Sequence, residues 1–257
     1  MNNGPITKRH WTQSMIGFCI LLILGAVYIS TEKKPHPATV VSPSASIRAH
    51  SIDEISRGDT TKQQVIFTFD AGSGIQSGQK ILSVLAEHHV KGTFFMTGRF
   101  VEAYPDFVRE VVSAGHEIFN HSYNHPYLTS IASVDVVNEL NEMDVALAKI
   151  TRGMASAPSV STRPYFRAPY GDRNERVLKA AYRDGYESVY WTTDAYDWKG
   201  PEKVTDAEVT DRIISNIMPG SIYLMHVGND ITGRILDDVF TTIEGKGYKI
   251  VSLTEGM

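Results

Sequence analysis

The chain has 257 residues, of which 42% are hydrophobic, and a formal net charge of −4. This length and apolar content suit one domain with a sizeable core plus a short appendage. The mild acidity and the lack of a basic stripe exclude nucleic-acid binding as the expected function, so we expect no nucleic-acid partner.

The amino-terminal residues predict a membrane segment. Lys8 and Arg9 precede an apolar run over residues 15–29 that carries no charge. At about 1.5 Å per residue the run is somewhat short for a bilayer core of about 30 Å, and it also resembles the apolar part of a secretory signal. Because bulky residues follow where a cleavage site needs small ones, an uncleaved anchor is favoured. We therefore predict a cytoplasmic tail over residues 1–14 and a transmembrane anchor or signal segment over residues 15–30.

A tether follows this segment. Residues 31–62 are rich in Pro, Ser, Ala and Thr and show no apolar period, as is typical of a flexible linker. The single cysteine, Cys19, lies inside the apolar run, so no disulfide can form within one chain. The domain predicted over residues 63–257 must therefore be held together by its core.

Strand-like and helix-like segments alternate through this domain. Short β-branched and aromatic runs predict strands, and apolar residues at helical spacing predict helices. The predicted strands are 65–69, 92–96, 117–120, 165–167, 188–191, 221–224 and 248–251, and the predicted helices are 78–89, 104–113, 133–150, 174–184, 205–217 and 235–246. About seven βα units of this kind imply an α/β fold with a parallel sheet.

Chemically reactive side chains stand at the carboxyl ends of these strands. They are Asp70, His121, Arg167, Asp194 and His226. An open, doubly wound sheet would spread them along a crevice, whereas a closed barrel brings them to one mouth. We therefore predict a βα barrel.

Two of the histidines are spaced as metal ligands. His121 and His125 stand at i and i+4, which on a helical turn places both rings on one face. The alternative is a pair of surface histidines before Pro126. The accompanying carboxylates, arginine and third histidine favour a hydrolytic metal site.

Five motifs in this order resemble those of the polysaccharide deacetylases of the NodB-homology type, which are carbohydrate esterase family four. The motifs are Thr68-Phe69-Asp70-Ala71-Gly72, His121 to Pro126, Arg167-Ala168-Pro169-Tyr170-Gly171, Asp194-Ala195-Tyr196-Asp197-Trp198 and Leu224-Met225-His226. The resemblance covers residues 64–257 and implies a distorted seven-stranded (β/α) barrel. It also implies metal-dependent removal of acetyl groups from N-acetylglucosamine-type polymers or, in some members, from acetylated xylan.

The resemblance assigns a role to each motif. It makes Asp70 the general base, held by Arg167, and His226 the general acid. Asp197, with Asp194 as second choice, would orient His226.

It also assigns binding roles. His121 and His125 would hold a divalent metal, with Zn²⁺ expected and Co²⁺ or Ni²⁺ as alternatives. The backbone N–H of Tyr170 would help to bind the oxyanion, and Trp198 and Leu224 would line the acetyl pocket. The metal would polarise the amide carbonyl and bring its bound water toward a neutral pKa.

Ala71 departs from the family pattern, which usually has a second aspartate there as a metal ligand. Three hypotheses follow. Water or another side chain replaces the carboxylate, Asp70 itself moves onto the metal, or catalysis is lost and sugar binding remains. The first is favoured because Asp70, Arg167 and His226 all keep their motif contexts.

The expected function is de-N-acetylation of an amino-sugar polymer, with peptidoglycan favoured over chitin-type oligosaccharides because of the predicted membrane tether. An acetylxylan esterase and a non-catalytic glycan-binding barrel are the alternatives. We expect a monomer with an N-acetylated polysaccharide substrate. It would be anchored in the cell membrane by a single pass with its catalytic domain outside, or alternatively secreted.

Overall fold

The sheet is built around strand β1 (Gln64–Ala71), whose eight residues are all buried. In the computed structural model, β1 pairs in parallel with β2 (Thr93–Met96) and β7 (Ile222–His226), and its first residues also pair with β8 (Lys249–Val251). The sheet continues through β3 (Glu117–Asn120), β4 (Tyr165–Phe166) and β5 (Glu187–Ser188) on one side and ends at β6 (Thr193–Asp194) on the other. The order is β5-β4-β3-β2-β1-β7-β6. The predicted α/β fold with a parallel sheet is confirmed.

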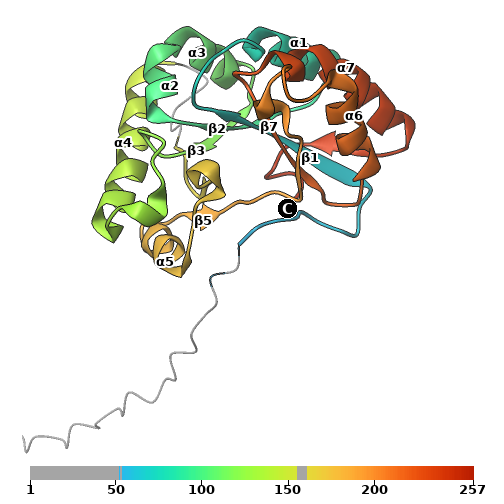
Figure 1. Cartoon of the computed structure of the whole chain (residues 1–257). Coiled ribbons are helices and arrows are strands. Elements are labelled where there is room, and N and C mark those ends of the chain that lie inside the picture. Colours follow the sequence, from blue (N-terminus) through green and yellow to red (C-terminus); the bar gives the residue numbers. More distant parts are fainter. Residues whose placement is uncertain (1–51, 53, 155–160) are drawn as a thin grey trace, which may run out of the picture. The chain divides into compact units, whose positions relative to one another are not determined.

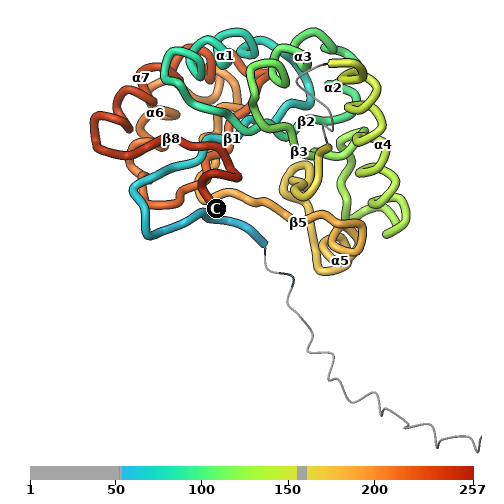
Figure 2. The backbone as a smooth tube through the Cα atoms, turned by 180° about the vertical axis from the view of Figure 1, so that it is seen from behind, coloured from blue at the N-terminus to red at the C-terminus, as the bar shows by residue number. Residues whose placement is uncertain are grey.

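The structure describes residues 52, 54–154 and 161–257 (Figures 1 and 2). The predicted tail and membrane segment lie outside these residues, as does most of the tether. Within the ranges described, no helix has both the length and the apolar character needed to cross a membrane.

The two faces of β1 differ in chemistry. Val65, Phe67 and Phe69 belong to the main apolar core beneath the helices. On the alternate positions, Ile66 joins a smaller apolar cluster, while Asp70 lies at the end of the strand beside other polar groups. Because side chains alternate along a strand, one side of β1 supports the helix layer and the other ends in the reactive group.

The helices connect the strands on the outside of the curled sheet (Figure 1). They are α1 (Gly78–Glu87), α2 (Gly98–Ala103), α3 (Pro105–Ser113), α4 (Ser133–Thr151), α5 (Glu175–Arg183), α6 (Asp206–Ser215) and α7 (Asp230–Gly245). Three short 3₁₀ turns, η1 (Leu128–Ser130), η2 (Pro169–Gly171) and η3 (Asp197–Lys199), lie in the loops after strands. All six predicted helices are present, within about five residues at each end.

Local contacts explain three differences between the predicted and observed elements. Helix α2 begins where the Thr97 hydroxyl accepts a hydrogen bond from Phe100 N at 3.1 Å, a short N-cap without a long apolar period. Helix α7 begins five residues earlier than predicted, because Asn229 Oδ1 accepts from Ile231 N at 3.0 Å. Strand β5 is shorter than predicted because Tyr190 and Trp191 leave the sheet and stack on each other.

The barrel is not closed by its strands, which corrects the prediction of a closed barrel. Among the strands described, β5 and β6 do not pair with each other. The gap is bridged instead by residues 54–58, where Ile55 pairs with Val189 and Arg57 with Ser221. Strands β4, β5 and β6 have only two residues each, too few for a continuous ladder. The result is a curled half-barrel, and the folded unit begins before residue 63.

Candidate active site

The loop that follows β3 brings the two predicted metal-binding histidines together. His121 Nε2 lies 3.2 Å from His125 Nε2, and His121 Nδ1 lies 2.9 Å from the carbonyl oxygen of Arg167. A carbonyl only accepts, so Nδ1–H is the donor and Nε2 keeps its lone pair. The predicted helical turn is absent, because Ser122 and His125 have φ of 63° and 62°. The two Nε2 atoms therefore converge through left-handed loop geometry, with the ring planes inclined at 67°.

This pair fits one divalent ion. Two imidazole ligands at about 2.0–2.1 Å from a tetrahedral Zn²⁺ have nitrogens about 3.3 Å apart, close to the 3.2 Å found here. Burial lowers the pKa of His121, and burial together with His121 lowers the pKa of His125 to about 4. Both rings are therefore neutral at pH 7, the form that binds metals.

The segment after β1 lies against the same pair. Asp70 Oδ2 is 3.4 Å from His121 Nε2. A Cβ placed on Gly72 would lie 3.6 Å from His125 Cδ2. Nevertheless, over the residues described, no three His, Cys, Asp or Glu side chains are arranged as a ready metal cage. The two histidines would supply two positions for a metal, and the rest of the coordination shell would be left to other ligands.

Asp70 is held as a carboxylate by Arg167. Arg167 Nη1 donates to Asp70 Oδ1 at 2.7 Å and to Thr68 Oγ1 at 2.8 Å, and the guanidinium also lies 4.1 Å from the centre of the Phe95 ring. Burial raises the pKa of Asp70, but the charge of Arg167 outweighs it and holds the pKa below its ordinary value. Asp70 is therefore an ionised acceptor at neutral pH.

His226 stands across from Asp70 on the neighbouring strand. The two residues are register partners between β1 and β7, so their side chains start about 4.8 Å apart on one face. Asp197, fully buried, accepts from His226 Nδ1 at 2.9 Å and from His226 N at 2.7 Å. Burial lowers the pKa of His226, but the charge of Asp197 and its hydrogen bond outweigh this and raise the pKa above its ordinary value.

The structure separates the two aspartates that the sequence left as alternatives. Asp197 contacts His226, whereas Asp194 accepts from Tyr196 N at 2.8 Å and from Trp198 Nε1 at 3.2 Å. Asp194 therefore orients Trp198. Sequence reasoning also missed Thr232, whose hydroxyl donates to Asp197 Oδ2 at 2.6 Å from the first turn of α7. No motif signals this residue, because it lies 35 positions from its partner.

A cavity of about 390 Å³ joins these groups. Its lining includes every sequence-predicted site residue except Arg167 and Asp197, which lie beneath it: Asp70, His121, His125, Tyr170, Asp194, Trp198, Leu224 and His226. Leu224 is 4% exposed and forms part of the wall, whereas Tyr170 and Trp198 are more than half exposed at the rim. Tyr170 also stacks on the exposed Tyr127, with ring centres 4.2 Å apart. The mouth is thus edged with aromatic faces.

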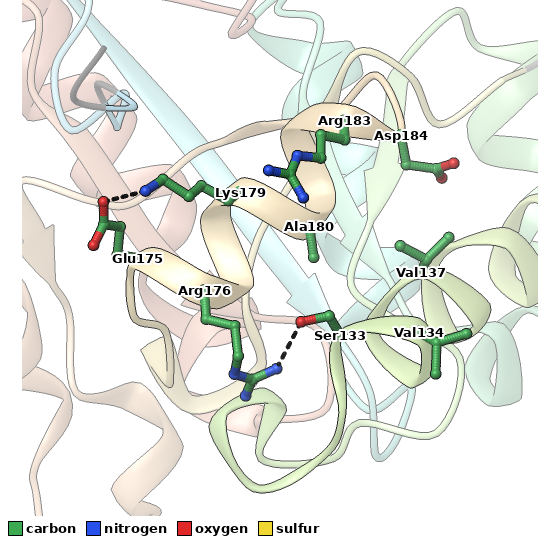
Figure 3. A pocket seen from close by; sticks show the side chains of 9 residues that line it. All are labelled: Ser133, Val134, Val137, Glu175, Arg176, Lys179, Ala180, Arg183 and Asp184. Atoms are coloured by element: carbon green, nitrogen blue, oxygen red, sulfur yellow. Dashed lines mark hydrogen bonds and ion pairs between the residues drawn. The ribbon is translucent and has the colours of Figure 1, made fainter. Parts of the chain in front are cut away.

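A second groove, of about 560 Å³, lies between α4 and α5 (Figure 3). Arg176 crosses it to Ser133 Oγ at 3.4 Å, and Lys179 pairs with Glu175 along α5. None of the predicted catalytic or metal-binding residues lines this groove, so it is separate from the chemical site.

Comparison with known proteins shows which family the chain resembles. Residues 57–189 match the family model described as polysaccharide deacetylase. The peptidoglycan-N-acetylmuramic acid deacetylase PdaA of Bacillus subtilis is 34% identical over 205 residues, which cover 80% of this chain and 75% of that protein. The solved structure of Bacillus subtilis PdaA superposes on this chain with a TM-score of 0.73 and 33% identity, covering 80% of this chain and 85% of that one.

Two further relatives bear on substrate and activity. A chitooligosaccharide deacetylase of Sinorhizobium fredii is 34% identical over 214 residues, covering 78% of this chain and 95% of that protein. A carbohydrate esterase family four pseudoenzyme from Bacillus anthracis has a TM-score of 0.72 and 30% identity, covering 80% of this chain and 69% of that one. A mutant of that pseudoenzyme with restored enzymatic activity has also been solved.

Proposed function

The chain belongs to the polysaccharide deacetylase family of hydrolases, and from this premise we propose that it removes N-acetyl groups from an amino-sugar polymer with the help of a divalent metal. Peptidoglycan is the favoured substrate and a chitin-type oligosaccharide the second, because relatives named for both are about one-third identical over most of this chain. The exposed Tyr127, Tyr170 and Trp198 support a glycan substrate, since aromatic faces at a cavity mouth suit the apolar faces of sugar rings.

One arrangement carries the proposal: an ionised Asp70 and a His226 of raised pKa face one cavity from neighbouring strands. Asp70 accepts the proton of the attacking water, because Arg167 keeps its carboxylate charged. His226 donates a proton to the departing nitrogen, because Asp197 favours the protonated form of its imidazole and fixes Nδ1. General base and general acid steps are each typically worth about 10²–10⁴-fold in rate.

The remaining residues bind and orient the substrate. His121 Nε2 and His125 Nε2 would hold the metal, which when bound polarises the acetyl carbonyl and acidifies the attacking water. The N–H of Tyr170, a residue of the cavity lining with a φ of 60°, would bind the developing oxyanion. Leu224 and Trp198 would enclose the acetyl methyl group.

A glycan-binding barrel with weak or no catalysis is the second candidate. Two observations favour it: Ala71 cannot ligate a metal, and the fold superposes on a pseudoenzyme with a TM-score of 0.72. An acetylxylan esterase would use the same groups on an ester.

Acetate release separates these candidates. We expect the purified domain to release acetate from N-acetylglucosamine oligomers or from peptidoglycan when Zn²⁺, Co²⁺ or Ni²⁺ is added. Asp70→Asn should reduce the rate at least about 10²-fold without unfolding the domain, because an amide cannot take the proton. Binding of oligomers without acetate release would establish the second candidate, and release from acetylated xylan alone would establish the esterase. A near-normal rate for Asp70→Asn would show that the base is misassigned.

A further inference from the structure

The loop that carries His121 and His125 is conformationally unfavourable by itself. Ser122 and His125 both adopt the left-handed region, with φ of 63° and 62°, although neither is glycine. Such residues persist only where surrounding contacts hold them. The convergence of the two Nε2 atoms therefore depends on groups outside the two rings.

Part of this support comes from within the loop and from β3. The buried Asn120 accepts from Ser122 N at 2.9 Å through Oδ1 and donates from Nδ2 to Leu140 O, also at 2.9 Å. Ser122 Oγ accepts from His125 N at 3.0 Å. From the start of α2, Gly98 N and Arg99 N also donate to the carbonyl oxygens of Ser122 and Tyr123, at 3.1 and 3.2 Å. These contacts fix the start of the loop and the backbone of His125, but none of them engages the N–H groups of Tyr123 and Asn124.

Glu139 of α4 supplies the missing restraint. Its Oε2 accepts from Tyr123 N at 3.0 Å and from Asn124 N at 2.7 Å, and its Oε1 accepts from Asn124 Nδ2 at 2.8 Å. The two residues it holds are the last two before His125. Because the acceptor is a charged carboxylate, these hydrogen bonds are stronger than neutral ones.

The restraint is anchored in the fold, because Glu139 projects from the longest described helix. The next residue of α4, Leu140, is fully buried and accepts through its carbonyl from Asn120. One turn of α4 thus holds both the start and the middle of the loop. Arg99 adds a contact from the other side, donating to Asn124 Oδ1 at 2.7 Å.

We propose that Glu139 is a positioning residue that pre-organises His121 and His125 for the metal. The proposal rests on the metal dependence in the proposed function, and it adds a residue that touches neither substrate nor metal. Loss of the carboxylate releases the N–H groups of Tyr123 and Asn124, and the loop then relaxes away from the geometry that brings the two Nε2 atoms 3.2 Å apart.

The first measurement is Zn²⁺ binding by calorimetry to chelator-stripped protein. We expect Glu139→Ala to raise the Kd by about 10–100-fold, the usual effect of removing a residue that orients metal ligands. Glu139→Gln keeps the side-chain length and one acceptor oxygen, so it should raise the Kd less, and it carries the comparison if the alanine variant does not fold. Glu142→Ala, one turn along the exposed face of α4, is the matched control and should leave the Kd within about twofold of the wild type.

The second measurement is hydrogen exchange in the metal-free protein. The amides of Tyr123 and Asn124 should exchange faster in both Glu139 variants than in the wild type, and Glu142→Ala should leave them unchanged. A Kd for the Glu139 variants equal to that of the wild type would overturn the proposal. Absence of zinc binding in the wild type would instead overturn the metal dependence in the proposed function. In that case the amide exchange rates alone test the role of Glu139. Faster exchange of Tyr123 and Asn124 in the Glu139 variants would support its role in positioning the loop, and unchanged exchange would overturn that role.

Discussion

Ala71 occupies the last position of β1, directly after Asp70, and its side chain is completely buried among apolar residues. A carboxylate introduced there would be shielded from water, so in the absence of a cation its desolvation would destabilise the fold. To reach a bound metal the carboxylate would have to turn from this core toward the histidine pair, where Asp70 Oδ2 lies 3.4 Å from His121 Nε2 and a Cβ placed on Gly72 would lie 3.6 Å from His125 Cδ2. Substitution of Ala71 by aspartate therefore tests whether the coordination shell of the metal is incomplete.

We predict that Ala71→Asp lowers the metal concentration for half-maximal activity, because a charged oxygen joins a shell otherwise completed by water. The maximal rate should be similar or lower, since the added charge makes bound water less acidic. The melting temperature of the chelator-treated variant should fall below that of the wild type and should rise more when Zn²⁺ is added. Metal titrations of activity and thermal unfolding measure these effects.

The matched control is Ala71→Asn, because the asparagine side chain has nearly the same size as that of aspartate but carries no charge. The Ala71→Asn variant should be less stable than the wild type with and without metal, and its metal affinity should be little higher than that of the wild type. If Ala71→Asp leaves the half-maximal concentration unchanged or raises it, another residue already completes the site.

At the scale of elements, helices α1 and α7 are joined by one histidine. His88, at the C-cap of α1, contacts Asp237 Oδ1 through Nε2 and Glu244 Oε2 through Nδ1, both at 2.9 Å. Its ring also packs edge-on against Phe240 of α7, with ring centres 5.4 Å apart. Burial lowers the pKa of His88, but the two carboxylates outweigh this and raise the pKa above its ordinary value.

This contact predicts a pH-dependent stability. Because the folded-state pKa is raised, the stabilisation is complete below about pH 6.5, the pKa of the unfolded chain, and is lost as the pH rises through the folded-state value. The carboxylates are 48% and 41% exposed, so each pair contributes under about 1 kcal/mol. His88→Gln should therefore lower the melting temperature by roughly 2–4 °C at pH 6 and by much less at pH 9.

Thermal unfolding of both forms at the two pH values checks this prediction, with His89→Asn as control. His89 is exposed and has a φ of 55°, a conformation that asparagine also adopts, and it makes neither of these contacts. An equal loss of stability at pH 6 and pH 9 would mean that His88 acts through packing on Phe240 alone.

At the scale of the whole molecule, the charged tail, the apolar run and the Pro/Ser-rich tether predict that the folded unit lies outside the membrane. Protease added to intact protoplasts should remove the domain, because Pro- and Ser-rich linkers of this composition are common sites of proteolysis. A cytoplasmic protein blotted from the same samples controls for lysis. Digestion of the domain only after lysis would place it inside the cell.

Much of the fold was predictable from the sequence because the signals are local. Apolar runs such as Val65–Phe69 and the helical stripe of residues 133–150 record the burial of each segment in its own spacing. Polar residues that end such runs, Asp70, His121 and His226 among them, are readable for the same reason. Since parallel strands share one carboxyl edge, order along the chain was enough to predict that these residues meet.

Other features depend on contacts between distant segments, which spacing does not encode. Asp197 and Asp194 are three positions apart, and the left-handed Tyr196, with φ of 66°, turns the chain between them so that only Asp197 contacts His226. The hydrogen bonds of Thr232 and Glu139 likewise come from helices packed against the site. The open edge between β5 and β6 exists because residues 54–58 occupy it. The sequence alone therefore determined which groups gather at the site, whereas backbone dihedrals and long-range packing decided which of them touch.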